Sequence, residues 1–480
     1  MSVDYGLIDR PERGSPVEST AHDTESAVVR MARAGTAAKT AQAPQTVLPA
    51  ALLESIPSGP LEDRANWERV RSLFTIDPEM VHLNVGTIGS VPKPVLDLLR
   101  ETDVDYARRP RDPYPPTTFA EARAALAARY GCDPDELAIV QGAADGNARI
   151  LNGLDLREGD EVVTTTHECY TAQAPLNILH NRRGVVVKKL TPRLGPDQSA
   201  EEIVQMFADA ITPRTKVLQW AGVTFTVGTT MPTKALARLA QEHGLISMVD
   251  GAHLPGQFDF DLHDLGVDFL SGSGAKYQCG PMGTGILYAR NKVLAEHNPL
   301  PLPEFWPVIT LWYPIEGELP PRTTGREQTY DIGTYVQKTG SADLSRGPAL
   351  QASTEIWERI GRANVQRYVW GLCSYLKERV VDHWGRDSLF SPLDDERLHS
   401  GMVAFQPFAD AAHAVDVAKF FEFEKRMEDQ HGVNLRFTFF PVRDAEGERF
   451  AVRLAPHLYN SRDELDHAVE AMIKVTAELS

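Results

Sequence analysis

Short β-branched runs that alternate with helical stretches are the feature that most limits how this chain can fold. The runs at 138–140, 161–165, 185–187, 216–220, 246–249 and 285–288 indicate strands, and helical stretches such as 232–242 separate several of them. Strands that alternate with helices predict a parallel sheet covered by helices on both faces. Ligands bind such sheets at the carboxyl ends of the strands, so we expect the chemistry of this chain there.

The elements divide the chain into three expected parts. Its 480 residues are too many for one ordinary core, which predicts two packed domains and an appendage. Residues 1–65 are rich in Ala, Pro, Thr, Ser and charge, and we expect a poorly ordered extension with one helix near 26–34. Residues 66–345 should form a large domain whose N-terminal segment packs on the small domain. Residues 346–480 should form that smaller α+β domain, with a long helical stretch at 350–383 and a C-terminal helix from about Ser461.

Charge and hydropathy exclude several classes of partner. The formal net charge of −17 disfavours binding to nucleic acid or anionic membranes. No apolar run approaches the roughly 18 residues of a membrane helix, and the N-terminus lacks a signal pattern. The four cysteines are far apart and form no CxxC pair, which is typical of reduced thiols and not of a metal site. We therefore expect a cytoplasmic protein without a bound metal.

The segment 246–290 carries the most chemical information. Asp250 ends an apolar strand, and a buried carboxylate there needs a charged or hydrogen-bonded partner. Lys276 follows among small residues, and a partly desolvated lysine loses its proton easily and can attack a carbonyl. Enzymes that use pyridoxal 5'-phosphate (PLP) need a lysine for the aldehyde and an acid for the pyridinium nitrogen. The pair predicts a PLP enzyme in which Lys276 carries the cofactor as a Schiff base.

The same segment resembles the class V aminotransferase family, within the PLP enzymes of fold type I. The similarity extends from about residue 70 to 478 and is closest to the isopenicillin N epimerase-like branch, whose opening motif resembles residues 82–96. The matching core motifs are Asp250-Gly251-Ala252-His253, Asp268-Phe269, Lys276 and the Gly-Pro-x-Gly-x-Gly of residues 280–285. The resemblance implies an α/β fold with a mostly parallel seven-stranded sheet, a small α+β C-terminal domain, and a homodimer with sites at its interface.

The resemblance also implies roles around the cofactor. Asp250 should pair with the pyridine nitrogen, Lys276 should move the proton at Cα, and His253 should hydrogen-bond the phenolic oxygen. His167 or Tyr170 should stack on the ring, and the shifted spacing of the segment 167–170 leaves both open.

Further residues are expected to hold the phosphate and the substrate. Backbone N–H groups of Gly142 and Ala143 should bind the phosphate at a helix start. The family usually has a threonine next, where this chain has Ala144-Asp145, so Ser273 and Ser341 are expected to supply hydroxyl groups. Ser341 would reach the phosphate of the partner subunit. On the substrate side, Arg453 should grip a carboxylate, and the remaining expected contacts are Asn84, Thr87 and Thr224.

The expected reaction breaks a bond at Cα of an amino-acid-type substrate, as in isopenicillin N epimerase-like enzymes of secondary metabolism. A C–S lyase, a decarboxylating or deaminating enzyme and an aminotransferase are alternatives on the same scaffold. A catalytically silent PLP-binding protein is an alternative from another class, because Ala275 replaces the usual histidine before the lysine. Residues 432–454 contain no cysteine, which argues against the persulfide chemistry of cysteine desulfurases.

Overall fold

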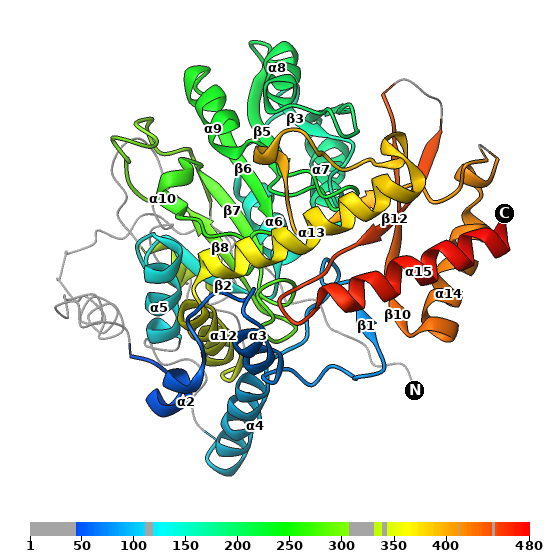
Figure 1. Cartoon of the computed structure of the whole chain (residues 1–480). Coiled ribbons are helices and arrows are strands. Elements are labelled where there is room, and N and C mark those ends of the chain that lie inside the picture. The colour runs from blue at the N-terminus through cyan, green and yellow to red at the C-terminus, as the bar shows by residue number, and fades with distance from the viewer. Residues whose placement is uncertain (1–44, 111–118, 307–330, 338–342, 411, 444–446) are drawn as a thin grey trace, which may run out of the picture. The chain divides into compact units, whose positions relative to one another are not determined.

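A seven-stranded sheet forms the core of the described residues, which are 45–110, 119–306, 331–337, 343–410, 412–443 and 447–480 of a computed structural model (Figure 1). The strand order is β2-β8-β7-β6-β5-β3-β4. Strand β8 is antiparallel to both of its neighbours, and the other neighbouring pairs are parallel. The predicted mostly parallel sheet is therefore confirmed. Its strands are β2 (Leu137–Val140), β3 (Glu161–Thr165), β4 (Val186–Leu190), β5 (Thr215–Ala221), β6 (Ile246–Gly251), β7 (Phe269–Ser273) and β8 (Gly285–Ala289).

Helices cover both faces of this sheet. The helices before residue 340 are α2 (Ala50–Ser55), α3 (Arg64–Arg71), α4 (Lys93–Arg108), α5 (Ala120–Tyr130), α6 (Ala143–Gly153), α7 (Tyr170–Arg183), α8 (Ala200–Ala210), α9 (Thr233–Glu242), α10 (Leu262–Leu265) and α11 (Ile332–Gln337). Successive strand residues point to opposite faces of the sheet. Val217 and Met248 pack with α6 and α7 on one face, while Leu218 and Val249 pack on the other face with α5, α8, α9 and α12 (Arg346–Ile360).

The C-terminal elements form a second core around smaller sheets. Strands β9 (Val403–Phe405), β11 (Arg436–Pro441) and β12 (Glu448–Leu454) make an antiparallel sheet in the order β11-β12-β9. Strand β1 (Val81–His82) pairs in parallel with β10 (Val433–Asn434), which joins the N-terminal segment to this region. Helices α14 (Val417–His431) and α15 (Arg462–Leu479) complete it, and Ser461 closes the start of α15 with a capping box.

The long helical stretch expected at 350–383 is two helices. Helix α12 (Arg346–Ile360) ends at Gly361, whose φ of 91° is disfavoured for residues with a side chain, and α13 (Arg362–Trp384) follows. Figure 1 shows α13, in yellow, running from the large sheet toward α15 and the C-terminal strands.

The expected extension at 1–65 needs a correction for its second part. Residues 1–44, with the helix expected near 26–34, lie outside the described residues. Residues 45–65 are ordered, because Leu48 and Ile56 are buried and the backbone N–H groups of Val47 and Leu48 donate to the Glu355 carboxylate of α12. Sequence composition cannot predict these contacts, because Glu355 lies about 300 residues away from Leu48 in the sequence. The boundary between the two expected domains, near residue 345, remains a prediction.

The parallel strands divide the sheet into two chemically different edges. Gly142 follows β2, Asp250 is the second-last residue of β6, and Lys276 follows β7. All three residues therefore lie at the carboxyl edge of the sheet. Strand β7 was not among the predicted strands, because its sequence FLSGS is rich in small residues. No described helix is long and apolar enough to cross a membrane.

Candidate active site

Asp250 presents an unpaired carboxylate oxygen inside the protein. Its side chain is 3% exposed; Oδ1 accepts from the backbone N–H of Ala252 at 3.0 Å, and Oδ2 has no hydrogen-bond partner. Burial raises the pKa of the Asp250 carboxyl, and the positive charge of Lys276 opposes that rise. A buried oxygen left in this state favours a ligand that brings a donor, above all a charged one.

Lys276 lies beside His253 at the same edge. The distance from Lys276 Nζ to His253 Nε2 is 2.9 Å, and His253 Nε2 lies 2.9 Å from the carbonyl oxygen of Gly86. Burial lowers the pKa of the Lys276 amine, and burial followed by the Lys276 charge lowers that of the His253 ring. The amine is therefore less basic than a surface lysine, as a nucleophile for an aldehyde requires.

The segment 82–96 holds the loop that carries Lys276 in place. The backbone N–H of Gly89 donates to the Ala275 carbonyl at 2.9 Å. A Cβ atom on Gly89 would lie 2.2 Å from the Lys276 carbonyl oxygen and 2.7 Å from Cys279 Sγ. Only glycine permits this close approach, which fixes the backbone from which the Lys276 side chain extends.

The start of α6 has the features of a phosphate site. Gly142 is its N-cap, with a φ of 144°, and a Cβ atom added there would meet nothing within 4 Å. Ala143 begins the helix, and its carbonyl accepts from Ser271 Oγ at 3.0 Å, which ties this turn to β7. Ser273 is 8% exposed and its Oγ accepts from the Ala275 N–H at 3.3 Å, leaving its own proton for another acceptor. Ser341 lies outside the described residues.

Arg453 is a buried guanidinium that no described carboxylate neutralises by an ion pair. It is 5% exposed; Nη2 donates to Asn84 Oδ1 at 3.2 Å and Thr87 Oγ1 at 3.0 Å, and Nη1 donates to the Phe225 carbonyl at 2.9 Å. Its Nε has no partner. Burial lowers the pKa of the Arg453 guanidinium to about 10. Asn84 and Thr87 thus lie with Arg453, as expected, and the unmatched positive charge fits a carboxylate ligand.

The two stacking candidates have different environments. His167 is fully buried, and its Nε2 lies 3.0 Å from the Pro441 carbonyl of β11, so the ring joins the two sheets and leaves no face open to a ligand. Burial lowers its pKa to about 4. Tyr170 is 57% exposed, with its ring centroid 6.0 Å from that of Phe225. The exposed ring makes Tyr170 the better stacking candidate of the two.

Thr224 is occupied within its own turn. It is 1% exposed, and its hydroxyl oxygen accepts from the Thr229 N–H at 3.0 Å. The backbone N–H of Thr224 donates to the Thr229 carbonyl at 2.9 Å. These two bonds fix the turn that contains Phe225. A direct contact between Thr224 and the substrate remains a prediction.

Three residues near the expected site were missing from the sequence-based set. Asn147 is fully buried on α6 and its amide influences Asp250, although neither amide atom reaches hydrogen-bond geometry. Glu168 is fully buried near Asp250. Cys169, the only one of the four cysteines that is not buried, is close enough to Lys276 and Arg453 for their charges to interact. A search for polar residues just after strand ends would have found Glu168 and Cys169, whereas only packing places Asn147.

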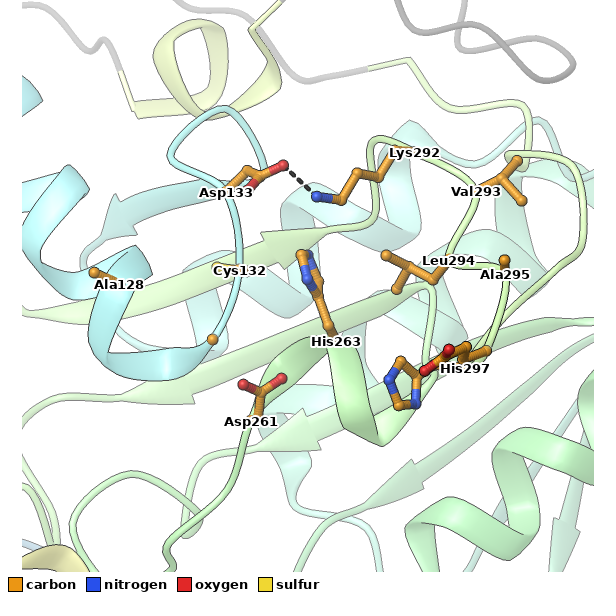
Figure 2. A pocket seen from close by; sticks show the side chains of 12 residues that line it. Ala128, Cys132, Asp133, Asp261, His263, Lys292, Val293, Leu294, Ala295 and His297 are labelled. Atoms are coloured by element: carbon orange, nitrogen blue, oxygen red, sulfur yellow. Dashed lines mark hydrogen bonds and ion pairs between the residues drawn. The ribbon is translucent and has the colours of Figure 1, made fainter. Parts of the chain in front are cut away.

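A pocket lies at the edge of the sheet opposite to Lys276 (Figure 2). It has a volume of about 710 Å³ and is lined by residues before β2, before β7 and after β8. Two of its lining residues form ion pairs: Lys292 pairs with Asp133, which also lines the pocket, at 2.5 Å, and His263 pairs with Glu136, outside the lining, at 2.5 Å. The described residues contain no group of His, Cys, Asp or Glu side chains suited to a metal ion. This pocket therefore lies apart from the chemistry around Lys276.

Comparisons with known proteins support the resemblance. The family model for class V aminotransferases matches residues 116–303. The isopenicillin N epimerase of Streptomyces clavuligerus is 26% identical over 420 residues, covering 86% of this chain and 99% of that protein. The solved apo structure of a cysteine desulfurase from Thermococcus onnurineus NA1 has a TM-score of 0.67 at 21% identity, covering 86% of this chain and 98% of that one. A second solved structure, of a C-DES mutant with glycine covalently linked to its PLP cofactor, has a TM-score of 0.66 at 19% identity, covering 84% of this chain and 98% of that one.

These findings confirm four predictions made from the sequence: the class V aminotransferase resemblance, the fold type I architecture, enzymatic activity and PLP as the cofactor. They relate the chain to isopenicillin N epimerase and to cysteine desulfurases, without fixing one reaction.

Proposed function

With class V aminotransferase similarity as the premise, we propose that this chain is a PLP enzyme that breaks the Cα–H bond of an amino-acid-type substrate, nearest in kind to an epimerase. The observation that carries the proposal is the unpaired, buried Oδ2 of Asp250 at the same sheet edge as the weakly basic amine of Lys276. An acid for a ring nitrogen and an amine for an aldehyde are the two groups that PLP requires.

Three features of the described residues fit the cofactor. Asp250 would hold the pyridine nitrogen, because its Oδ2 lacks a donor. The first turn of α6 would hold the phosphate, because Gly142 faces open space and the helix start presents free N–H groups. Lys276 would hold the aldehyde carbon, with His253 beside it to meet the phenolic oxygen. When bound, PLP supplies a ring that accepts electrons from the substrate Cα.

The substrate would be held by residues from both cores. Arg453 would bind its carboxylate through the guanidinium fork, with Asn84 and Thr87 fixing the fork. The freed amine of Lys276 would then remove the Cα proton on its own side of the substrate, and epimerisation would take a proton from a second donor on the opposite side. Binding through Arg453 keeps the carboxylate in place during this exchange, which favours epimerisation over decarboxylation.

Other parts of the proposal follow from the family resemblance alone. They are a homodimer with sites at its interface, a cytoplasmic location and a role in secondary metabolism. A C–S lyase, a deaminating or decarboxylating enzyme and an aminotransferase remain the alternatives for the reaction. The absence of cysteine from residues 432–454 argues against desulfurase chemistry.

Reduction of the PLP-loaded protein with borohydride, followed by peptide mapping, tests the cofactor site. We expect a yellow protein and a single modified lysine, Lys276. Lys377 is the matched control, because it is 1% exposed and burial lowers its pKa to about 8. Lys276→Ala should abolish the modification and Lys377→Ala should leave it unchanged. A protein that stays colourless with PLP, or that is modified at Lys377, contradicts the proposal.

Incubation of the loaded enzyme with single-enantiomer amino acids in heavy water identifies the reaction. An epimerase exchanges the Cα hydrogen for deuterium and yields both enantiomers without loss of amino acid. Release of ammonia and an oxo acid would indicate a lyase or a deaminating enzyme. Loss of carbon dioxide would show that the substrate carboxylate is consumed.

A further inference from the structure

Glu168 is a buried acid whose surroundings are those of an anion. It is 0% exposed and lies three residues after the end of β3. Oε1 accepts from Thr165 Oγ1 at 2.8 Å and from the Ala221 N–H at 3.1 Å, and Oε2 accepts from Gln219 Nε2 at 3.0 Å. The backbone N–H of Ala221 can only donate, and the other two groups are placed as donors. Three donors and no acceptor suit an ionised carboxylate.

Glu168 lies near Asp250, and the two acids act on each other through their charges. Ala221, which donates to Glu168, stands opposite Asp250 in the register of β5 and β6. The negative charge of Asp250 contributes to the raised pKa of the Glu168 carboxyl, which reaches about 7, mainly through burial. Two acids thus share one buried region at the carboxyl edge, where Asp250 lacks a partner for Oδ2.

The cationic groups near this pair are few. No described Lys, Arg or His side chain forms an ion pair with Glu168. Lys276 acts on Asp250 through its positive charge only when it is protonated, and burial lowers its pKa. His167, the preceding residue, is kept neutral near pH 7 by burial. Cys169, the following residue, adds no positive charge. The pair therefore carries more negative charge than the described residues around it balance, and a cation at Asp250 Oδ2 would relieve this imbalance.

We propose that Glu168 is a positioning residue that acts through Asp250: its carboxylate adds a second negative charge behind Asp250 and so keeps the pyridine nitrogen of PLP protonated. The proposal rests on the PLP site described above. A protonated ring nitrogen draws electrons from the substrate Cα more strongly, so Glu168 would support the reaction without touching substrate or cofactor.

Nitrogen NMR of the protein loaded with PLP that carries 15N in its ring tests this role directly. The chemical shift reports whether the ring nitrogen is protonated, and its alkaline titration gives the midpoint. In Glu168→Gln, which keeps the shape and removes the charge, we expect PLP to bind and the midpoint to fall by at least about one pH unit, a tenfold loss of proton affinity. An unchanged midpoint in Glu168→Gln overturns the proposal.

Glu161→Gln is the matched control. Glu161 is also fully buried and lies on the same strand, but it starts β3 at the opposite edge and pairs with Lys188 at 2.7 Å and Arg214 at 3.0 Å. Its loss should lower stability and leave the nitrogen midpoint unchanged. An equal fall of the midpoint in both variants would show that general loosening is the cause and would also overturn the proposal.

Difference infrared spectra of the apo-protein and the PLP-loaded protein provide a second test. Near pH 6 the apo-protein should show a protonated carboxyl band that disappears when PLP binds, because the ring charge ionises Glu168. The band is assigned to Glu168 by its absence from apo Glu168→Gln, because burial also raises the pKa of Asp250. A spectrum without this change contradicts the proposal. Absence of PLP binding in the wild type would instead contradict the PLP site itself, so the two failures are distinguishable.

Discussion

Lys276 Nζ lies 2.9 Å from His253 Nε2, and this ring nitrogen also lies 2.9 Å from the Gly86 carbonyl oxygen. A carbonyl only accepts, so we assign the Nε2 proton to the bond with Gly86. Nε2 then has no lone pair for an ammonium group, and the arrangement suits Lys276 as an uncharged amine. Both residues are largely removed from water, and burial disfavours a charge on either.

The rate at which the apo-protein attaches PLP should therefore depend on pH with a midpoint below the ordinary lysine value of 10.5. Burial lowers the pKa of the Lys276 amine, so the reactive neutral form is present at lower pH than on a surface lysine. Stopped-flow absorbance over a pH series measures this midpoint. A midpoint at the ordinary value would show that Lys276 is fully solvated.

Asp250→Asn should lower turnover more than about tenfold, or roughly 1.4 kcal/mol of barrier, while PLP remains bound. The same change should not destabilise the apo-protein near pH 8. Burial raises the pKa of Asp250, so its stabilising contribution is complete below the ordinary value of 3.8 and is lost as pH rises through the raised pKa. Steady-state kinetics and denaturant unfolding measure the two effects.

Asp268→Asn is the control for that variant. Asp268 is also buried, but it accepts from Ser247 Oγ at 2.9 Å and pairs with Arg290 at 2.7 Å. Breaking this buried pair should cost about 3–5 kcal/mol of unfolding free energy. Equal destabilisation by the Asp250 and Asp268 variants would assign Asp250 a structural role.

Arg453→Lys should weaken substrate binding by about 1.5–3 kcal/mol, or roughly one to two orders of magnitude, with PLP binding intact. Lysine keeps the charge but loses the fork that Asn84 and Thr87 support. Kinetics with the substrate and its carboxamide analogue measure the effect. If the variant weakens binding of the substrate and of its carboxamide analogue equally, Arg453 does not bind the carboxylate.

Tyr170→Ala should reduce the PLP affinity of the apo-protein about three- to tenfold, as expected for loss of a ring contact of about 0.5–1.5 kcal/mol. Tyr170→Phe should keep the affinity. His167→Gln should keep it too, because the His167 ring is buried and faces Pro441. Fluorescence titrations with PLP compare the three variants, and loss of affinity in His167→Gln alone would reverse this assignment.

His167 should also make the folded protein sensitive to acid. Its pKa falls from the ordinary 6.5 to about 4 in the folded state. The stability that this residue contributes is complete above pH 6.5 and is lost as pH falls toward about 4. The difference in unfolding free energy between wild type and His167→Gln should change by on the order of 3 kcal/mol across that range. A difference that is independent of pH would show that His167 titrates normally.

The local pattern of the sequence was sufficient for much of the fold and for the central chemistry. Apolar β-branched runs predicted β2, β3, β5, β6 and β8 closely, because a strand's two-residue period and its turn residues are local properties. The position of Asp250 at a strand end and of Lys276 among small residues predicted a cofactor site for the same reason, and both residues lie at the carboxyl edge of the sheet. Strand β7 escaped prediction because its Gly and Ser residues have no strong strand preference.

Packing between distant segments decided the rest. Arg453 meets Asn84 across 369 residues of sequence, and only the folded chain shows that no described acid forms an ion pair with it. Burial of the His167 ring and exposure of the Tyr170 ring favour Tyr170 for the stacking role, which stays a prediction, and the hydrogen bonds of Glu168 depend on donors from β5. Burial and hydrogen-bond partners are set by elements that meet only in the folded state, so residue type and spacing can nominate such groups, while the tertiary structure determines their exposure and their partners.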